Sequence, residues 1–169
     1  MKIYKINPAA EIPAYATEGS ACFDLRACFK GLDKIRAYNP LNRELFQPVK
    51  IQGGKLGIQI PPQYRVLVPT GLIFNLPKNT VMRIYARSGL ALKEGLGMAN
   101  GVAVIDSDYV EETFVMLLNG SDNVVFVADG DRVAQASLEE AKRLVLEETP
   151  NRPQQKTDRN GGLGSTGVQ

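Results

Sequence analysis

The feature that most constrains the fold is a pattern repeated along most of the chain: a short β-branched or aromatic run, then a turn. Residues 2–6, 64–69 and 80–85 are such runs, and clusters of Gly, Pro and Asn separate them. A short strand buries only one face, so neighbouring strands must pair into sheets and stack their apolar faces. About ten or eleven such runs are typical of a sandwich or barrel. We therefore predict an all-β fold, a distorted, jelly-roll-like β-barrel.

Two stretches depart from this pattern. Residues 86–96 have helical composition over about two turns, with Ser88 at the expected N-cap and Gly95 at the expected C-terminal stop. Residues 138–149 are rich in Leu, Glu, Ala, Lys and Arg, and they fit either a short helix or a further strand. One short helix does not change the all-β class.

The length of 169 residues predicts one domain with a sizeable core. Residues 29–55 are rich in Lys, Arg and Asn and contain Pro40 and Pro48, so we interpret them as an insert, an excursion from the core with an extra hairpin. We place the β-barrel domain at residues 1–157. The Gly-rich residues 158–169 fit either a disordered tail or a flexible flap that closes over a ligand.

Composition excludes several classes of function. The 20 basic and 18 acidic residues nearly balance, which argues against direct nucleic-acid binding along a basic face. The chain has no histidine, so imidazole bases, Ser-His-Asp triads and His-ligated zinc are excluded. We interpret Cys22 and Cys28 as buried free thiols of a reducing compartment, the cytoplasm, although they are also able to pair. No apolar run is long enough for a signal peptide or a membrane span.

One stretch concentrates polar groups at the end of an apolar strand. The run from Gly101 to Ile105 leads directly into Asp106, Asp108 and Tyr109. A carboxylate beside a buried strand is expensive to bury. It either caps the turn through its own side chain or lies over a pocket and takes part in chemistry. The spacing by itself leaves both interpretations open.

Two further segments have side chains suited to anions. Arg87 precedes Ser88 and Gly89 at the expected helix start, where free N–H groups, the helix dipole and a guanidinium favour phosphate. An N-cap serine beside a surface arginine is the structural alternative. In the turn at residues 130–135, Gln135 is able to donate to an oxyanion. We interpret Arg132 as a structural partner of Asp131 or of another acid.

These segments together resemble the deoxyuridine triphosphate nucleotidohydrolase (dUTPase) family of the all-β, homotrimeric kind. Five motifs of that family occur in order across nearly the whole chain. They are Ala21-Cys22-Phe23-Asp24-Leu25, Arg87-Ser88-Gly89-Leu90-Ala91, residues 100–109, Gly130-Asp131-Arg132-Val133-Ala134-Gln135, and residues 159–167. The resemblance implies hydrolysis of dUTP to dUMP and pyrophosphate, which keeps uracil out of DNA and supplies dUMP for dTMP synthesis.

The resemblance also implies roles for the third motif. Asp106 would activate a water molecule for in-line attack on the α-phosphorus, a task that needs no histidine. Tyr109 would pack under the deoxyribose and leave no room for a 2′-hydroxyl. Asn100 and the backbone around Val104 and Ile105 would read the uracil edge.

The other motifs would hold the phosphates and close the site. Mg²⁺ would chelate the triphosphate and meet the protein through water, with Asp24 as a candidate anchor and no direct protein ligand. Phe114 would be a further nucleotide contact. The remaining substrate-binding residues implied by the family are Arg87, Ser88, Gly89, Gln135, Arg159, Leu163, Gly164 and Ser165.

The chain departs from the family pattern at a few positions. Leu163 stands where an aromatic ring is usual, and Cys22, Ala103 and Glu111 stand where glycine is usual. The insert at 29–55 is longer than the usual connection, which suggests a phage-encoded member acting in the host cytoplasm, with the insert as a surface for a partner.

We expect a homotrimer whose sites are shared between subunits. Three alternatives remain: a dCTP deaminase-type enzyme of the same fold, a regulatory trimer switched by the nucleotide, and a capsid-type jelly roll.

Overall fold

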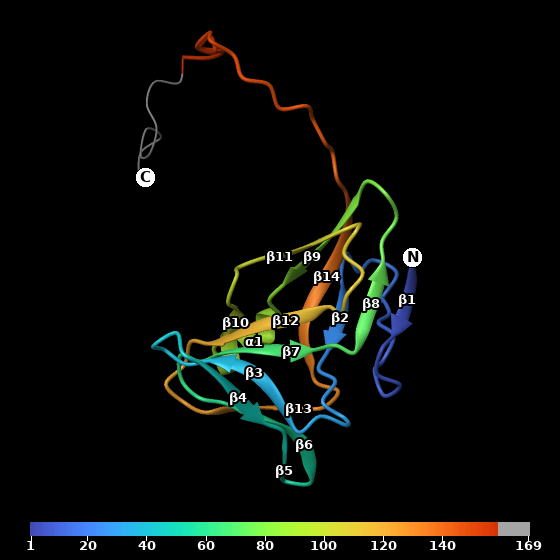
Figure 1. Ribbon diagram of the computed structural model, residues 1–169, viewed down its shortest axis with the longest axis vertical. Coiled ribbons are helices and arrows are strands. Elements are labelled where there is room, and N and C mark those ends of the chain that lie inside the picture. The colour runs from blue at the N-terminus through green and yellow to red at the C-terminus, as the bar shows by residue number, and fades with distance from the viewer. Residues whose placement is uncertain (159–169) are drawn as a thin grey trace.

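The all-β prediction is confirmed by the computed structural model, which describes residues 1–158. These residues form fourteen strands and one short helix, α1 (Ser88–Glu94). The arrangement is shown in Figure 1. The strands are β1 Lys2–Lys5, β2 Phe23–Arg26, β3 Lys34–Tyr38, β4 Glu44–Pro48, β5 Lys50–Gln52, β6 Lys55–Ile60, β7 Arg65–Pro69, β8 Leu72–Asn75, β9 Thr80–Tyr85, β10 Leu96–Met98, β11 Ala103–Asp106, β12 Phe114–Asn119, β13 Val125–Ala128 and β14 Arg132–Glu140.

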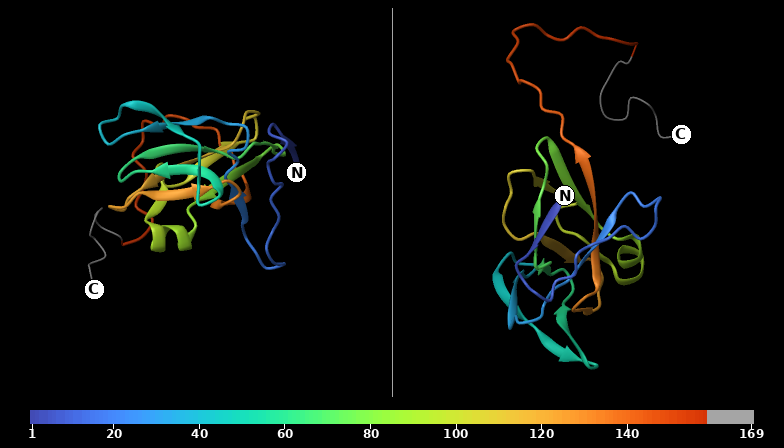
Figure 2. Two further views of the ribbon diagram at one scale, coloured as in Figure 1. Left: turned by 90° about the horizontal axis from the view of Figure 1, so that it is seen from below. Right: turned by 90° about the vertical axis from the view of Figure 1, so that its right-hand side faces the viewer.

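Within the described residues the strands pair into four sheets rather than one closed barrel. The larger two have the orders β10-β12-β7-β3-β4 and β11-β9-β14-β2, and the smaller two are β13-β6-β5 and β1-β8. Every pairing is antiparallel. In Figure 2 the sheets wrap around a shared interior and α1 lies outside them.

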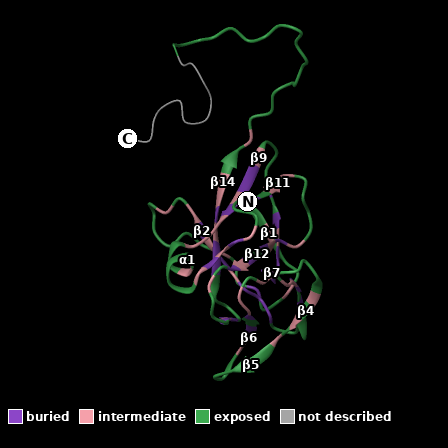
Figure 3. Ribbon diagram, turned by 90° about the vertical axis from the view of Figure 1, so that its left-hand side faces the viewer, coloured by how far each residue is buried: buried purple, intermediate pink, exposed green. Residues whose placement is uncertain are grey.

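The core follows from the two-residue period of the strands. In β9, Met82 and Ile84 are fully buried, whereas Arg83 and Tyr85 between and after them are half-buried. Alternation of this kind places one face of each sheet inward and leaves the other to carry polar groups. Figure 3 shows the buried positions gathered along the strands in the middle of the body and the exposed ones on α1 and the loops. The largest fully buried side chains include Phe29, Phe74, Leu25, Ile58, Ile60, Leu72, Met82, Ile84, Leu96 and Leu117.

The helix begins at Ser88, one residue earlier than a cap at Ser88 would place its start. The prediction of Ser88 as N-cap is wrong, because Arg87 holds that position with extended backbone (φ −89°, ψ 127°) and Ser88 is the first helical residue. No side chain caps this end, and the Arg87 side chain instead bonds Asp24. Gly95 ends the helix as predicted, with φ 68° in the left-handed region that glycine adopts without strain.

The segment 29–55 contributes both a hairpin and part of the core. Strands β3 and β4 pair from Lys34 opposite Pro48 to Tyr38 opposite Glu44, and β3 also pairs with β7. The inward side chains Ile35 and Ala37 are buried. The segment is thus tied into the five-stranded sheet through β3, and its outward face is the exposed part.

Residues 138–149, which fit either a helix or a strand by sequence, form no helix, and only the first three belong to a strand. Strand β14 continues to Glu140, and the residues from 141 to 158 contain neither helix nor strand. They leave the body as an extended arm, at the end opposite to β5 and β6 (Figure 1). Leu144, Val145 and Leu146 on this arm are 79%, 84% and 93% exposed.

Both cysteines are free thiols, as predicted. Cys28 is buried, and its burial, reinforced by the nearby Asp129 and Glu112 carboxylates, raises the pKa of its thiol. Cys22 is only half-buried, so the expectation that both are buried holds for Cys28 alone.

Candidate active site

Asp106 is the last residue of β11 and lies opposite Val81 of β9. Its own carbonyl accepts the Tyr109 N–H at 3.1 Å, which closes the turn. The Tyr109 hydroxyl then donates to the carbonyl of Glu112 at 2.9 Å. The Asp106 side chain is exposed, and it takes part in none of the hydrogen bonds or ion pairs of the described residues. The backbone therefore makes the turn, and the carboxylate is left to accept from water or substrate.

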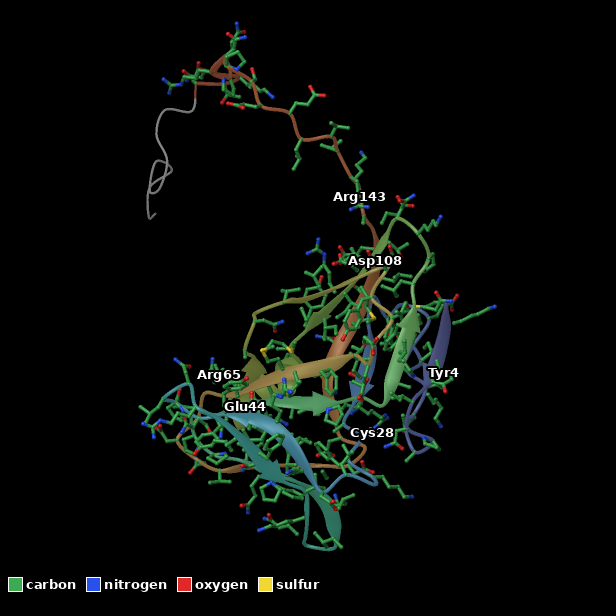
Figure 4. All side chains as sticks on the ribbon, in the orientation of Figure 1. Tyr4, Cys28, Glu44, Arg65, Asp108 and Arg143 are labelled. Carbon is green, nitrogen blue, oxygen red and sulfur yellow. The ribbon has the colours of Figure 1, made fainter. Side chains whose placement is uncertain are left out.

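A polar cleft of about 420 Å³ lies beside the Asp106 carboxylate. Figure 4 shows Asp108 and Arg143 at this end of the body, where the arm leaves β14. A cleft with cations and carboxylates on opposing elements is suited to a charged ligand rather than an apolar one. Its lining residues are Asn79, Thr80, Val81, Arg83, Asp106, Ser107, Asp108, Glu140, Ala141, Lys142 and Arg143.

A second site is built around Asp24 of β2. Arg87 donates from Nε to Asp24 Oδ1 at 2.8 Å, and Arg132 donates from Nη1 to Asp24 Oδ2 at 3.1 Å. Arg87 also donates from Nη1 to the Arg132 carbonyl at 3.1 Å. One carboxylate thus orients two guanidinium groups, of which Arg87 is three-quarters buried and Arg132 is exposed. Two cations beside one anion leave a local positive charge that favours an anionic ligand.

The cleft at this second site has a volume of about 240 Å³. Ser88 and Gly89 enter it from the first turn of α1, and Gln135 enters from β14, where it lies opposite Asp24. Gln135 donates from its side-chain nitrogen to the carbonyl of Ala86 at 3.0 Å, and an amide nitrogen has a second N–H that is able to donate to a ligand. The lining residues are Ala16, Ser20, Cys22, Asp24, Arg87, Ser88, Gly89 and Gln135.

Both clefts open on the outward face of one sheet, β11-β9-β14-β2, but far apart. Asp106 lies level with Val81, whereas Asp24 lies level with Gln135 and Tyr85 at the other end of β9. Three strand spacings give about 14 Å across the sheet and four residues give about 13 Å along it, a diagonal of roughly 20 Å. One chain therefore does not bring its water-activating candidate to its anion-binding cleft.

A carboxylate network fills the face between the two clefts. Glu139 accepts from the Ser137 hydroxyl at 2.9 Å, the Tyr85 hydroxyl at 3.0 Å and Arg83 Nε at 2.9 Å. These hydrogen bonds, that of Ser137 foremost, lower the pKa of the Glu139 carboxyl. The network keeps this part of the face charged and hydrophilic.

The other sequence-predicted residues divide between these places. Asn100 and Val104 are exposed and Ile105 is half-buried, all on or next to β11 with Asp106. Phe114 is half-buried at the start of β12, in a different sheet. Arg159, Leu163, Gly164 and Ser165 lie outside the described residues.

The dUTPase family model matches residues 56–167. The chain belongs to the dUTPase family. Curated relatives include the deoxyuridine 5′-triphosphate nucleotidohydrolases of Dictyoglomus turgidum, 35% identical over 98% of this chain and 97% of the relative, and of Treponema pallidum, 38% identical over 96% and 94%. Among solved structures, a mutant of the Staphylococcus bacteriophage 80alpha dUTPase with dUpNHpp superposes with a TM-score of 0.71 at 15% identity, covering 99% of this chain and 98% of that one.

The sequence did not indicate which residues of the dUTPase motifs contact one another. Arg132 is the structural partner of an acid as expected, but that acid is Asp24, 108 residues away in the chain. Asp131 instead accepts the Ala128 N–H at 2.8 Å and caps its own turn. Strand pairing of β2 with β14 brings Asp24 to Arg132, and no local spacing signals that register.

Residues 1–158 contain neither a cluster of metal-binding side chains nor a helix able to span a membrane. Residues 1–158 contain no group of three or more His, Cys, Asp or Glu side chains placed to hold a metal ion. Among the same residues, no helix is long and apolar enough to cross a bilayer.

Proposed function

We propose that Asp106 activates the water that cleaves dUTP into dUMP and pyrophosphate. Membership of the dUTPase family makes the chain a dUTP diphosphatase, an enzyme of nucleotide metabolism. The observation that carries the role of Asp106 is its exposed carboxylate, held at a strand end beside a polar cleft and engaged by no other side chain of the described residues. Such a carboxylate can accept a proton from water within hydrogen-bond reach.

The complete site is shared between subunits of a homotrimer. The separation of roughly 20 Å between Asp106 and Asp24, estimated from strand spacings, is too long for one triphosphate to contact both in one chain. A neighbouring subunit that docks its Asp106 hairpin near the Asp24 cleft would complete the site, and cyclic symmetry would repeat this arrangement around the ring.

The C-terminal arm supports the same assembly. Its apolar run, Leu144 to Leu146, is almost fully exposed where the arm leaves the body. Three consecutive exposed apolar residues are a docking segment rather than an ordinary surface. Packed on a neighbouring subunit, the arm would carry residues 158–169 to a site as a flap, with Leu163 covering the base and Arg159, Gly164 and Ser165 contacting phosphates.

Residues of the Asp106 hairpin select the nucleotide. Asn100 and the backbone at Val104 and Ile105 read the edge of uracil, and the Tyr109 ring leaves no room for a 2′-hydroxyl. The hydrogen bond from the Tyr109 hydroxyl to Glu112 supports this role, because it holds the ring in one orientation. Phe114 contributes a further nucleotide contact.

The Asp24 cleft binds the phosphates. Arg87, Ser88, Gly89 and Gln135 line it, and the Asp24 carboxylate orients the Arg87 guanidinium. Mg²⁺ fits this site as an ion that the substrate phosphates carry, because Mg²⁺ needs few protein ligands and keeps several waters. Bound there, it would neutralise phosphate charge, and the lone pairs of Asp24 not used by arginine would be able to accept from its waters.

The test is a substrate panel with Asp106→Asn, using Asp122→Asn as the matched control on an exposed turn. The wild type and Asp122→Asn release pyrophosphate from dUTP far faster than from dCTP, dTTP or UTP, and Asp106→Asn loses that release while it stays folded and trimeric. Substantial turnover by Asp106→Asn refutes its role as the base. Ammonia from dCTP would instead indicate the deaminase-type reaction.

The outward face of residues 29–55 is a second surface, which we propose for a partner in the cytoplasm. Tyr38 of this segment lies between Glu44 of β4 and Arg65 of β7, and Figure 4 labels these two charged residues. The segment has Lys30, Lys34, Arg36, Arg43, Lys50 and Lys55 against Asp33 and Glu44. Because Ile35 and Ala37 are buried, changing Lys34 and Arg36 to serine is a cleaner test than deletion. Unchanged dUTP turnover in this variant would show that this face is not needed for catalysis. Lost turnover would show that it contributes to the active site.

A further inference from the structure

Residues 107–113 join β11 of one sheet to β12 of the other without pairing in either. In the described chain, this linker makes one hydrogen bond back to Asp106 of β11, and all its other hydrogen bonds to residues outside the linker end on the corner between β7 and β8. The Thr113 N–H donates to the Leu72 carbonyl at 2.9 Å, and the Thr70 hydroxyl donates to the Thr113 carbonyl at 2.5 Å. The corner thus holds the linker at its downstream end.

Glu112 makes the remaining bond of this attachment. Its half-buried carboxylate accepts the Gly71 N–H at 2.7 Å. The carbonyl of the same residue accepts the Tyr109 hydroxyl at 2.9 Å, and the Tyr109 N–H bonds the Asp106 carbonyl at 3.1 Å. A continuous set of hydrogen bonds therefore leads from Gly71 through Glu112 and Tyr109 to Asp106.

The corner itself is rigid, so it can serve as an anchor. Gly71 has φ 68°, and an added Cβ would lie 2.8 Å from Ala10 Cβ and 2.9 Å from Asn7 Cβ. Its carbonyl accepts the N–H groups of Ile6 and Asn7 at 3.0 and 3.3 Å. The N-terminal segment therefore fixes Gly71 from one side while Glu112 bonds it from the other.

Stability by itself does not account for a carboxylate at position 112. Burial raises the pKa of Glu112, and the single hydrogen bond from Gly71 only partly opposes this. Among the described residues this carboxylate has one donor and no cation, and half-burying such a group costs free energy compared with an apolar side chain. The neighbouring Glu111 is exposed and makes no such bond within residues 1–158, so the attachment is specific to the acceptor at position 112.

We propose that Glu112 is a positioning residue, whose bond to the Gly71 N–H sets the places of Asp106 and Tyr109. The inference rests on the roles proposed above for those two residues. In this role Glu112 acts without contacting the substrate. Its effect reaches the reaction through the linker geometry, in both the rate of cleavage and the discrimination against a 2′-hydroxyl.

The experiment compares Glu112→Gln, Glu112→Asp and Glu112→Ala with Glu111→Ala as the matched control. Each variant is assayed as the full-length trimer for kcat and KM with dUTP and with UTP. Glutamine keeps an oxygen acceptor at the same reach, whereas aspartate keeps the charge and is shorter by one methylene. We expect Glu112→Gln to stay near the wild type, and Glu112→Ala to lose roughly 10- to 100-fold in kcat, as misplacement of about 1 Å does.

The order of the variants decides the outcome. Positioning through the hydrogen bond is supported if Glu112→Asp has a lower kcat for dUTP than Glu112→Gln. The preference for dUTP over UTP should then fall in parallel with kcat. The proposal is overturned if Glu112→Asp has a higher kcat than Glu112→Gln. It is also overturned if all Glu112 variants keep the same dUTP-to-UTP preference as Glu111→Ala. This comparison stands even if Glu112→Ala fails to fold. Asp106→Asn, assayed alongside, separates the two proposals. If Asp106→Asn is inactive and the Glu112 variants behave like the wild type, only the positioning role is refuted. If Asp106→Asn is active, both proposals are refuted.

Discussion

Replacing Gly71 with alanine tests whether the β7–β8 corner is the rigid anchor that the structure indicates. An L-residue at φ 68° carries a backbone cost of about 1–2 kcal/mol. The new Cβ would also press on Ala10, Asn7 and Cys28, and overpacking of this kind costs about 1–3 kcal/mol. The less flexible unfolded chain offsets roughly 0.5–1 kcal/mol of this. A loss of about 2–4 kcal/mol remains, which lowers Tm by roughly 5–15 °C in a domain of this size.

Thermal unfolding followed by circular dichroism at matched protomer concentration measures this loss, since assembly makes Tm depend on concentration. Gly31→Ala is the control, because Gly31 has φ 82° but no atom within 4 Å of the added Cβ. Its backbone cost alone should lower Tm by about 2–4 °C. Equal shifts in the two variants would refute the argument that the corner is held by contacts on both sides. We also expect Gly71→Ala, where it folds, to lower kcat for dUTP, because it displaces the donor to Glu112.

Asp24→Asn should raise KM for dUTP by roughly 10- to 100-fold with a smaller change in kcat, since a charge-assisted hydrogen bond is worth about 1.5–3 kcal/mol and asparagine cannot orient both Arg87 and Arg132. A lower KM would show that removal of the negative charge outweighs the loss of orientation. Stability should fall as pH rises from 4.5, the ordinary pKa of a glutamate, through the raised pKa of Glu112, because the folded state there binds more protons than the unfolded state. Urea midpoints across this range should fall less steeply in Glu112→Gln than in Glu111→Gln, and parallel profiles would contradict the shift.

The strands and the family were within reach of the sequence, because both depend on local patterns. The alternation in residues 80–85 predicts β9, and the glycine after Glu94 predicts the end of α1. The same patterns were weaker where local signals conflict. The polar residues Lys34, Arg36 and Tyr38 indicate a segment outside the core. The structure nevertheless buries Ile35 and Ala37, which alternate with them along β3.

The sequence names candidate site residues, but it does not indicate how they are arranged. The motif around Asp24 and the motif around Arg132 each point to nucleotide binding, and neither indicates that these two side chains form an ion pair. The helix start illustrates the same limit. Ser88 is of a residue type that favours the N-cap, but Arg87 holds that position and its side chain pairs with Asp24, which is distant in the chain.

The sequence by itself determined the all-β class, the family, and the residue types available for each step of dUTP hydrolysis. Only the tertiary structure decided that Asp106 and Asp24 lie at opposite corners of one sheet face, and that Glu112 is tied to Gly71. The physical reason is that a period of two residues tells which face a side chain occupies but not which strand lies beside it. Register between distant strands sets the neighbours, and it arises from the packing of the whole core.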